Sequence, residues 1–406
     1  MALSISPIQI QSLTTTYGTP LYVYDVDTIT KQYHILTNAF AHTDAKFFYA
    51  CKANTNINIL QHIQRIGANI DCSSINEAKL ALRAGFKGSQ ILYTSNGIHF
   101  SEIEEAVSLG VYINIDSLSN LEKFGKKYGH SYPVGLRLRP NIMAGGNLKI
   151  STGHTKSKFG IPIEQIDDII ALKNKYDIHI QGLHIHTGSE IKDVDVFIKG
   201  SSVLFDLANR FDELVYLDLG GGFKVAYKEG EEGTDMIKLG QEVTAAFDHF
   251  HQSYPKKLQV WFEPGKFLVS AAGYFVTAVN VLKQNGETLI AGVNSGFNHL
   301  IRPMFYDAYH EITNISNPEG PRKNYMVTGN ICETDTFATD RLLPEVREGD
   351  LLVFSNAGAY GFEMGNNYNS RLLPAQVMIK DGNPHLIRKR DIFEDLLRNQ
   401  VIVDEN

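Results

Sequence analysis

Eight short apolar segments alternate with amphipathic stretches over about 220 residues of this chain. Each segment is rich in β-branched residues or alternates apolar with polar positions, which is typical of strands. The expected strands are Lys46–Ala53, Asn69–Ser73, Ile91–Thr94, Tyr112–Asp116, Val134–Arg139, His179–His186, Leu214–Leu219 and Gln259–Glu263. The helical patterns include Asn76–Ala84, Ser101–Leu109, Leu118–Tyr128, Ile163–Tyr176, Val194–Arg210 and Asp235–Tyr254. Ser101 and Glu104 have capping-box spacing, which predicts that Ser101 caps its helix. The alternation favours a closed (β/α)8 barrel of the TIM type over an open doubly wound sheet.

The alternation of strand and helix patterns ends after Glu263. Apolar segments now follow one another without helical patterns of comparable length, which predicts a separate all-β domain beginning near Lys266. Its expected strands are Phe275–Gln284, Thr288–Asn294, Tyr325–Asn330, Leu351–Ser355 and Gln376–Lys380. The turn residues from Lys380 to Pro384 indicate a hairpin. A charged amphipathic stretch, Arg390–Asn399, predicts a final helix.

Composition limits the function classes. The 406 residues carry a formal net charge of -7 and no basic runs, which argues against nucleic-acid and anionic-membrane partners and for a small-molecule substrate. Three scattered cysteines, Cys51, Cys72 and Cys332, form neither a disulfide framework nor a zinc motif, so no metal site is expected. Neither a signal peptide nor a membrane-spanning run is recognisable, and a cytoplasmic protein is expected.

Chemically reactive residues follow several of the barrel strands. Active sites of such barrels lie at the carboxyl ends of the strands, where these residues would meet. The positions are Lys52, Asp71, Arg137, His184, His186, Gly220, Gly221, Gly222, Glu263, Pro264, Gly265 and Lys266. A lysine held in a pocket of low dielectric would have a depressed pKa and act as a nucleophilic amine. A strand-end lysine that simply reaches solvent is the alternative.

The glycine triplet Gly220–Gly222 can expose backbone N–H groups to an anion, and Ser189 offers a hydroxyl to the same anion. Glu263 follows apolar residues, so its carboxylate requires a cationic partner. Together these groups meet the needs of pyridoxal phosphate. Lys52 would bond covalently to the cofactor, the glycines and Ser189 would hold its phosphate, His186 would stack on its ring, and Glu263 would keep the pyridine nitrogen protonated. A tight turn at the triplet and a core role for His186 remain open.

The motifs at these positions resemble the alanine-racemase-like, fold type III pyridoxal-phosphate decarboxylases, most closely the branch that acts on diaminopimelate. The matching segments are Tyr49–Asn54, Ser151–Gly153 leading to Ser157–Gly160, Gly182–Ser189, Leu217–Phe223 and Glu263–Gly265. The resemblance implies that the N-terminal segment completes the β-domain. The expected domains are therefore a cofactor-binding barrel at residues 22–265 and a β-domain at residues 1–21 and 266–406. The resemblance also implies a head-to-tail homodimer with shared active sites.

The β-domain motifs carry the resemblance to the substrate site. Arg302 and Tyr306 match family residues that bind the distal carboxylate of diaminopimelate. Cys332 matches a proton donor contributed by the neighbouring subunit, and Glu333 matches a residue on the distal amine. Tyr360 matches a tyrosine that contacts cofactor and substrate. The resemblance further assigns Asp71, Arg137, Pro264, Gly265 and Lys266 to the cofactor site, and Lys266 also to the substrate.

Four positions depart from the family pattern. Lys266 stands where arginine is usual, which keeps the charge but loses bidentate recognition of an anion. Arg139 replaces a common asparagine, Thr187 a common isoleucine, and the stretch from Arg371 is less rich in proline and arginine.

The resemblance implies decarboxylation of meso-2,6-diaminopimelate to L-lysine and carbon dioxide, the last step of lysine biosynthesis. Another decarboxylase of this architecture, acting on ornithine, arginine or carboxynorspermidine, is the nearest alternative. An amino-acid racemase and a non-catalytic cofactor binder are more distant ones.

Overall fold

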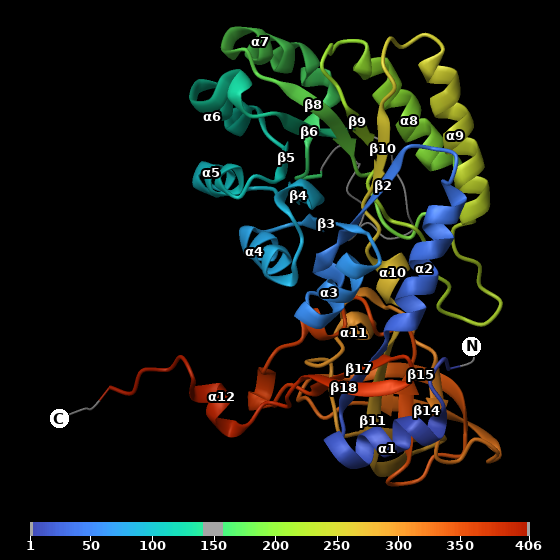
Figure 1. The fold of residues 1–406 in the computed structure, drawn as a ribbon. Coiled ribbons are helices and arrows are strands. Elements are labelled where there is room, and N and C mark those ends of the chain that lie inside the picture. Colours follow the sequence, from blue (N-terminus) through green and yellow to red (C-terminus); the bar gives the residue numbers. More distant parts are fainter. Residues whose placement is uncertain (1–2, 141–156, 404–406) are drawn as a thin grey trace. The chain divides into compact units, whose positions relative to one another are not determined.

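The computed structural model describes residues 3–140 and 157–403, which fall into two compact units (Figure 1). The barrel unit comprises the described residues of 30–226 and 232–268, and the β unit comprises the described residues of 1–29, 227–231 and 269–406. The motif segment Ser151–Gly153 lies outside the described residues.

The barrel unit is built on parallel strands that close into a ring. They are β2 (Ala45–Ala50), β3 (Asn69–Cys72), β4 (Ile91–Thr94), β5 (Tyr112–Ile115), β6 (Val134–Arg139), β8 (Ile180–Ile185), β9 (Tyr216–Asp218) and β10 (Gln259–Phe262). Each pairs with its neighbours in this order, and the pairing of β10 with β2 closes the ring. A two-residue strand, β7 (Ile161–Pro162), adds to β6. The predicted closed barrel is confirmed.

Helices connect the barrel strands. They are α3 (Ile57–Arg65), α4 (Ile75–Ala84), α5 (Phe100–Ser108), α6 (Leu118–Tyr128), α7 (Ile166–Tyr176), α8 (Asp195–Ala208) and α9 (Met236–His251), with α2 (Val26–Ala39) before β2 and α10 (Lys266–Val269) after β10. Polar caps explain several starts: the side chain of Ser74 accepts from the Glu77 N–H at the start of α4, and Asp235 caps α9. The predicted cap at Ser101 is wrong, because α5 begins one residue earlier and His99 accepts the N–H of Ser101.

Large side chains fill the inside of the strand ring. Phe48, Leu92, Tyr216 and Trp261 come from four strands and form one buried cluster. The rings of Tyr216 and Trp261 stack with their centroids 3.5 Å apart. Gly182 makes room for this stack, since a Cβ there would lie 2.0 Å from the Tyr216 ring. The cluster makes the barrel a packed core rather than a pore.

The β unit is a mixed sheet that includes the N-terminal segment. Its strands are β1 (Leu21–Asp25), β11 (Gly273–Asn285), β12 (Thr288–Val293), β13 (Ile312–Asn314), β14 (Arg322–Thr328), β15 (Thr336–Pro344), β16 (Leu351–Phe354), β17 (Ala375–Lys380) and β18 (Asn383–Arg388). Strand β1 runs antiparallel to β11 and parallel to β17. The short helices α1 (Pro7–Tyr17), α11 (Arg302–Tyr306) and α12 (Phe393–Leu397) belong to the same unit.

The last hairpin and the last helix test two sequence predictions. Strands β17 and β18 pair antiparallel with Lys380 opposite Asn383, which confirms the hairpin. Asp381 and Gly382 both have positive φ, as a tight two-residue turn requires. The final helix is shorter than predicted, because α12 covers only Phe393–Leu397. In the described part of the chain, no helix is long and apolar enough to cross a membrane.

Candidate active site

Lys52 lies just after β2, in a single 3-10 turn formed by Cys51–Ala53. The sequence predicted a strand at Lys46–Ala53, but β2 ends at Ala50, and Lys52 belongs to the turn that follows β2. Its side chain is 45% exposed, and its Nζ lies 3.6 Å from Oδ2 of Asp71, which is 1% exposed at the end of β3. The amine is thus accessible to a small molecule while a buried carboxyl group holds it in position.

Three buried carboxyl groups gather at the same ends of the strands. Burial and the neighbouring charge of Glu263 raise the pKa of both Asp71 and Asp218 well above its usual range. Burial also acts to raise the pKa of Glu263, but its contact with His184 and the charge of Lys52 outweigh this and lower the pKa to about 2. Glu263 is therefore the member of the group that carries the negative charge, because like charges in one pocket favour a single ionised member.

Two histidines at the end of β8 face this carboxylate. Nε2 of the fully buried His184 lies 3.3 Å from Oε2 of Glu263. Burial lowers the pKa of His184, and burial together with the charge of Arg137 lowers the pKa of His186 to about 3. Nδ1 of His186 accepts the N–H of Gly221 at 3.2 Å. The ring of His186 is therefore a neutral, flat imidazole of fixed orientation.

Arg137, on β6, supplies a buried positive charge to the same barrel. Its guanidinium lies 4.6 Å from the centroid of the Phe159 ring. Burial lowers the pKa of Arg137, while the charges of Glu263 and Asp71 act in the opposite direction. The guanidinium thus balances part of the carboxyl cluster.

The glycine triplet packs tightly against other backbone segments. A Cβ at Gly221 would lie 2.1 Å from the carbonyl oxygen of Glu263, and one at Gly222 would lie 2.1 Å from that of Gly188. The N–H of Gly220 donates to Oδ1 of Asp218 at 2.8 Å, and that of Gly221 donates to His186. Two of the three amides thus bond within the protein, and among the described residues the N–H of Gly222 is the one left for a ligand.

The segment after β10 closes over the same end of the barrel. The carbonyl of Pro264 accepts the Ala50 N–H at 3.0 Å, and the carbonyl of Gly265 accepts the N–H of Leu268. Lys266 is 10% exposed and forms an ion pair with Glu190. Glu190 follows Ser189 directly, so the lysine is placed beside the serine expected to bind phosphate.

In the β unit, Arg302 begins α11 and is 6% exposed. Its Nη1 lies 3.2 Å from Nε2 of His310, and its guanidinium stacks 5.0 Å from the centroid of the Tyr227 ring. Burial and the adjacent Arg302 lower the pKa of His310 to about 3, so the histidine is neutral. Tyr306 ends the same short helix and is partly buried.

Cys332 and Glu333 belong to a different, exposed cluster of the β unit. The hydroxyl of Tyr368 donates to Oε1 of Glu333 at 2.5 Å, which lowers the pKa of Glu333 and raises that of Tyr368 to about 12. The Nδ2 of Asn369 lies 3.2 Å from Sγ of Cys332.

Tyr360, the other expected contact of cofactor and substrate in the β unit, lies after β16. It is partly exposed and has a positive φ of 55°.

The structure adds residues that sequence reasoning missed. Asp218 is completely buried beside the glycine triplet, and Glu190 pairs with Lys266. In the β unit, Tyr227 and His310 form the surroundings of Arg302. An acidic residue inside an apolar strand, as in Leu217–Leu219, was the one available sequence signal. The others are distant in sequence from the groups they contact.

The barrel residues fit a pyridoxal phosphate group. Within the described residues, Oε1 of Glu263 is buried and has no hydrogen-bond partner. A buried carboxylate oxygen without a donor is costly, and a protonated pyridine nitrogen would supply that donor. The accessible amine of Lys52 and the neutral ring of His186 complete the set.

The donor atoms of His184, Asp218 and Glu263 also lie within 4.8 Å of one another, a spacing that a metal ion could use. This cluster belongs to the cofactor site already described, since Glu263 is the residue expected to meet the pyridine nitrogen, and Oδ1 of Asp218 already accepts the N–H of Gly220.

Comparison with known proteins identifies the class. Residues 26–270 match the family of the pyridoxal-dependent decarboxylases through its pyridoxal-binding domain. The chain belongs to this family, and its cofactor is pyridoxal 5′-phosphate. The enzyme is therefore a lyase that breaks a carbon–carbon bond.

Whole-chain relatives narrow the class to diaminopimelate decarboxylases. That of Methanothermobacter thermautotrophicus is 37% identical over 394 residues, which cover 95% of this chain and 92% of that protein. That of Campylobacter jejuni is 34% identical over 389 residues, covering 93% and 95%. The crystal structure of the Helicobacter pylori diaminopimelate decarboxylase complexed with L-lysine has a TM-score of 0.89 at 31% identity, covering 96% and 98% of the two chains.

Proposed function

We propose that this chain decarboxylates meso-2,6-diaminopimelate to L-lysine and carbon dioxide. The observation that carries the substrate assignment is the buried guanidinium of Arg302. Among the described residues, its close contacts are a neutral histidine and an aromatic ring rather than a carboxylate. A buried cation with such neighbours favours an anionic ligand, and a planar guanidinium suits a carboxylate. The distal carboxylate of diaminopimelate meets that need, and ornithine has no such group.

The positions of the barrel residues support the following roles. Lys52 holds the cofactor covalently, Ser189 and the glycine triplet, through the N–H of Gly222, bind its phosphate, and the neutral His186 packs on its ring. Asp71 positions the amine of Lys52, and Arg137, Pro264 and Gly265 shape the pocket. Lys266 contributes charge near the phosphate and the substrate, with its position set by Glu190.

The chemistry depends on where the protons are held. When bound, pyridoxal phosphate supplies a pyridinium ring that accepts the electron pair left behind by carbon dioxide. Glu263, with its pKa near 2, stays ionised and keeps the proton on the ring nitrogen. Sγ of Cys332 then gives its proton to the carbon that has lost the carboxylate, and Tyr360 orients the reacting end.

Residues of the β unit recognise the distal end of the substrate in this proposal. Arg302 and Tyr306 bind the distal carboxylate, and Glu333 binds the distal ammonium group. We further propose a homodimer in which Cys332 and Glu333 complete the site of the neighbouring subunit. A cytoplasmic location accords with the three cysteines, all of which are free thiols.

A substrate panel tests this proposal. Purified holoenzyme is incubated with meso-diaminopimelate, ornithine, arginine or lysine, and the released carbon dioxide and amine products are measured. We expect carbon dioxide and L-lysine from meso-diaminopimelate only. Turnover of ornithine or arginine in its place would contradict the assigned substrate, and inverted stereochemistry without carbon dioxide would indicate a racemase.

A further inference from the structure

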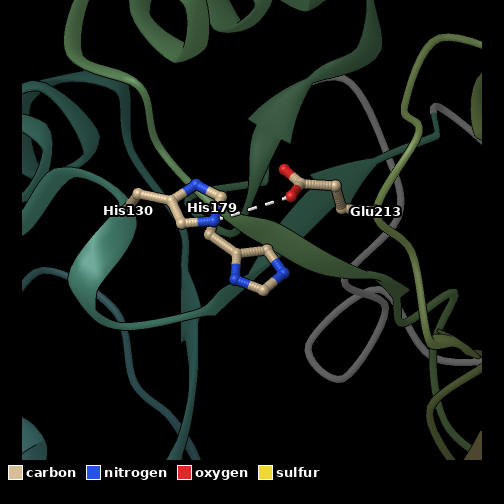
Figure 2. Close-up of side chains that lie close together, drawn as sticks. All are labelled: His130, His179 and Glu213. Carbon is tan, nitrogen blue, oxygen red and sulfur yellow. Dashed lines mark ion pairs between the residues drawn. The ribbon is translucent and has the colours of Figure 1, made fainter.

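A cluster of metal-binding side chains lies at the amino ends of the barrel strands, away from the carboxyl ends that carry Lys52 and Glu263. It consists of His130, His179 and Glu213 (Figure 2). One donor atom from each lies within 4.8 Å of the other two. We propose that these three residues bind a divalent transition-metal ion of the zinc class.

The fold brings the three residues together through neighbouring strands. His130 lies in a 3-10 turn shortly before β6, His179 directly precedes β8, and Glu213 lies in the segment that leads into β9. These strands are adjacent in the ring, in the order β6, β8 and β9. The carbonyl of His179 accepts the N–H of Val134 at 2.9 Å, which fixes its backbone to β6. The three positions are thus fixed by the barrel core.

Each ring nitrogen of His130 faces a different carboxylate. Its Nδ1 lies 3.7 Å from Oδ1 of Asp177, and its Nε2 lies 3.7 Å from Oε1 of Glu213, the contact drawn in Figure 2. Histidines that bind metals commonly donate their second ring N–H to a carboxylate, which sets ring orientation and basicity. At 3.7 Å the Nδ1 and Oδ1 atoms are beyond hydrogen-bond distance, so Asp177 becomes the outer partner only when the two side chains approach each other, and Nε2 is the atom presented to the metal.

The donor set determines which ions fit. Two imidazoles and one carboxylate suit zinc, nickel or copper, whereas calcium and magnesium prefer oxygen ligands alone. Zinc bonds of about 2.0–2.1 Å in a tetrahedral site place donors about 3.3 Å apart. The rings of His130 and His179 are nearly parallel, with centroids 4.8 Å apart. Binding therefore requires the two rings to tilt and the donor atoms, which now lie within 4.8 Å of one another, to approach to about 3.3 Å.

The freedom needed for this closure is present in the side chains. The side chain of His130 is 52% exposed and that of Glu213 is 34% exposed, so both can rotate without disturbing the core. Solvent can also reach the ion and fill its fourth position. A bound ion would tie together the three segments that lead into β6, β8 and β9 and would stabilise the folded barrel.

Zinc binding by tag-free holoenzyme saturated with pyridoxal phosphate tests the proposal. Equilibrium dialysis against zinc sulfate, followed by metal analysis, is compared for the wild type, His130→Ala, His179→Ala and Glu213→Gln. His42→Ala removes another exposed barrel-unit histidine and is the matched control. We expect one zinc ion per chain in the wild type and control, and at least about tenfold weaker binding in the three cluster variants.

A second measurement separates binding at this cluster from binding elsewhere. Zinc should raise the thermal unfolding midpoint of the wild type and of His42→Ala, and should leave that of the three cluster variants unchanged. Decarboxylase activity should be equal in all five proteins, because none of these substitutions touches the catalytic end of the barrel. Zinc retained unchanged by the cluster variants, or no zinc retained by the wild type, would overturn the proposal.

Discussion

Arg302 is the residue of the β unit on which the substrate assignment chiefly depends. Its Ala variant removes the guanidinium proposed to bind the distal carboxylate, and an unpaired charge at such a site costs about 3–5 kcal/mol. We therefore expect kcat/KM with meso-diaminopimelate to fall by about two to four orders of magnitude. The cofactor absorbance should be retained, since Arg302 is not among the residues proposed to hold the cofactor. Arg302→Lys keeps the charge and should lose less. Equal kcat/KM in wild type and Arg302→Ala would contradict this role.

His310 makes stability depend on pH with a defined sign. Its pKa of about 3 in the folded protein lies below the value of about 6.5 in an unfolded chain. Its contribution to the free energy of unfolding is therefore complete above pH 6.5. This contribution is lost as pH falls toward 3, at about 1.4 kcal/mol per pH unit. His310→Gln cannot titrate there, so its stability deficit relative to wild type should narrow from pH 7.5 to pH 5 in denaturant unfolding. A deficit that stays constant or widens would show that the histidine is not held neutral.

At the scale of elements, the connection from β9 to the glycine triplet depends on two properties of Gly222. Its φ of 94° is strained for other residues, and a Cβ would lie 2.1 Å from the carbonyl oxygen of Gly188. Gly67 has nearly the same φ, 92°, but a Cβ there would meet no atom within 4 Å, so Gly67→Ala isolates the backbone strain.

We expect Gly67→Ala to lower stability by about 1–2 kcal/mol and to leave cofactor binding intact. Gly222→Ala should lose cofactor binding as well, because the Gly188 segment leading to Ser189 must move. Cofactor titration by absorbance and thermal unfolding measure both effects. Equal behaviour of the two variants would mean that close packing at Gly222 is unimportant.

Elements with strong and regular patterns were predicted to the residue. The bounds of β4, β6 and α6 agree in sequence and structure, since each has a clear apolar face and a sharp end. The missed strands have weaker patterns: β13 has three residues, most of β18 is exposed, and β15 mixes buried and exposed positions without strict alternation. Strand β1 was missed as a strand because its partners lie more than 200 residues away.

The candidate site was predictable where residues follow strands. Lys52, Asp71, His186 and Glu263 come together because parallel strands present their carboxyl ends to one opening. The charge distribution among the carboxyl groups was not predictable, since it depends on distances between groups from different strands. For the same reason, the sequence pointed to no metal site, although His130 and Glu213 lie close together in space.

At the scale of the whole molecule, shared active sites can be tested with two inactive variants. Lys52→Ala and Cys332→Ala should each be inactive alone. If each site combines Lys52 of one subunit with Cys332 of the other, a mixed dimer has one intact site. Unfolding and refolding an equal mixture should restore about a quarter of wild-type activity, because about half of the dimers are mixed. No restored activity in verified mixed dimers would contradict shared sites.

The most direct test of the account is to locate the covalent cofactor. The active holoenzyme is reduced with borohydride, digested and mapped by mass spectrometry, with Lys123→Ala, which removes an exposed lysine on α6, as the matched control for Lys52→Ala. We predict a pyridoxyl label on Lys52 in the wild type and in Lys123→Ala, and loss of both label and activity in Lys52→Ala. A label on any other residue of the active enzyme would contradict the central claim.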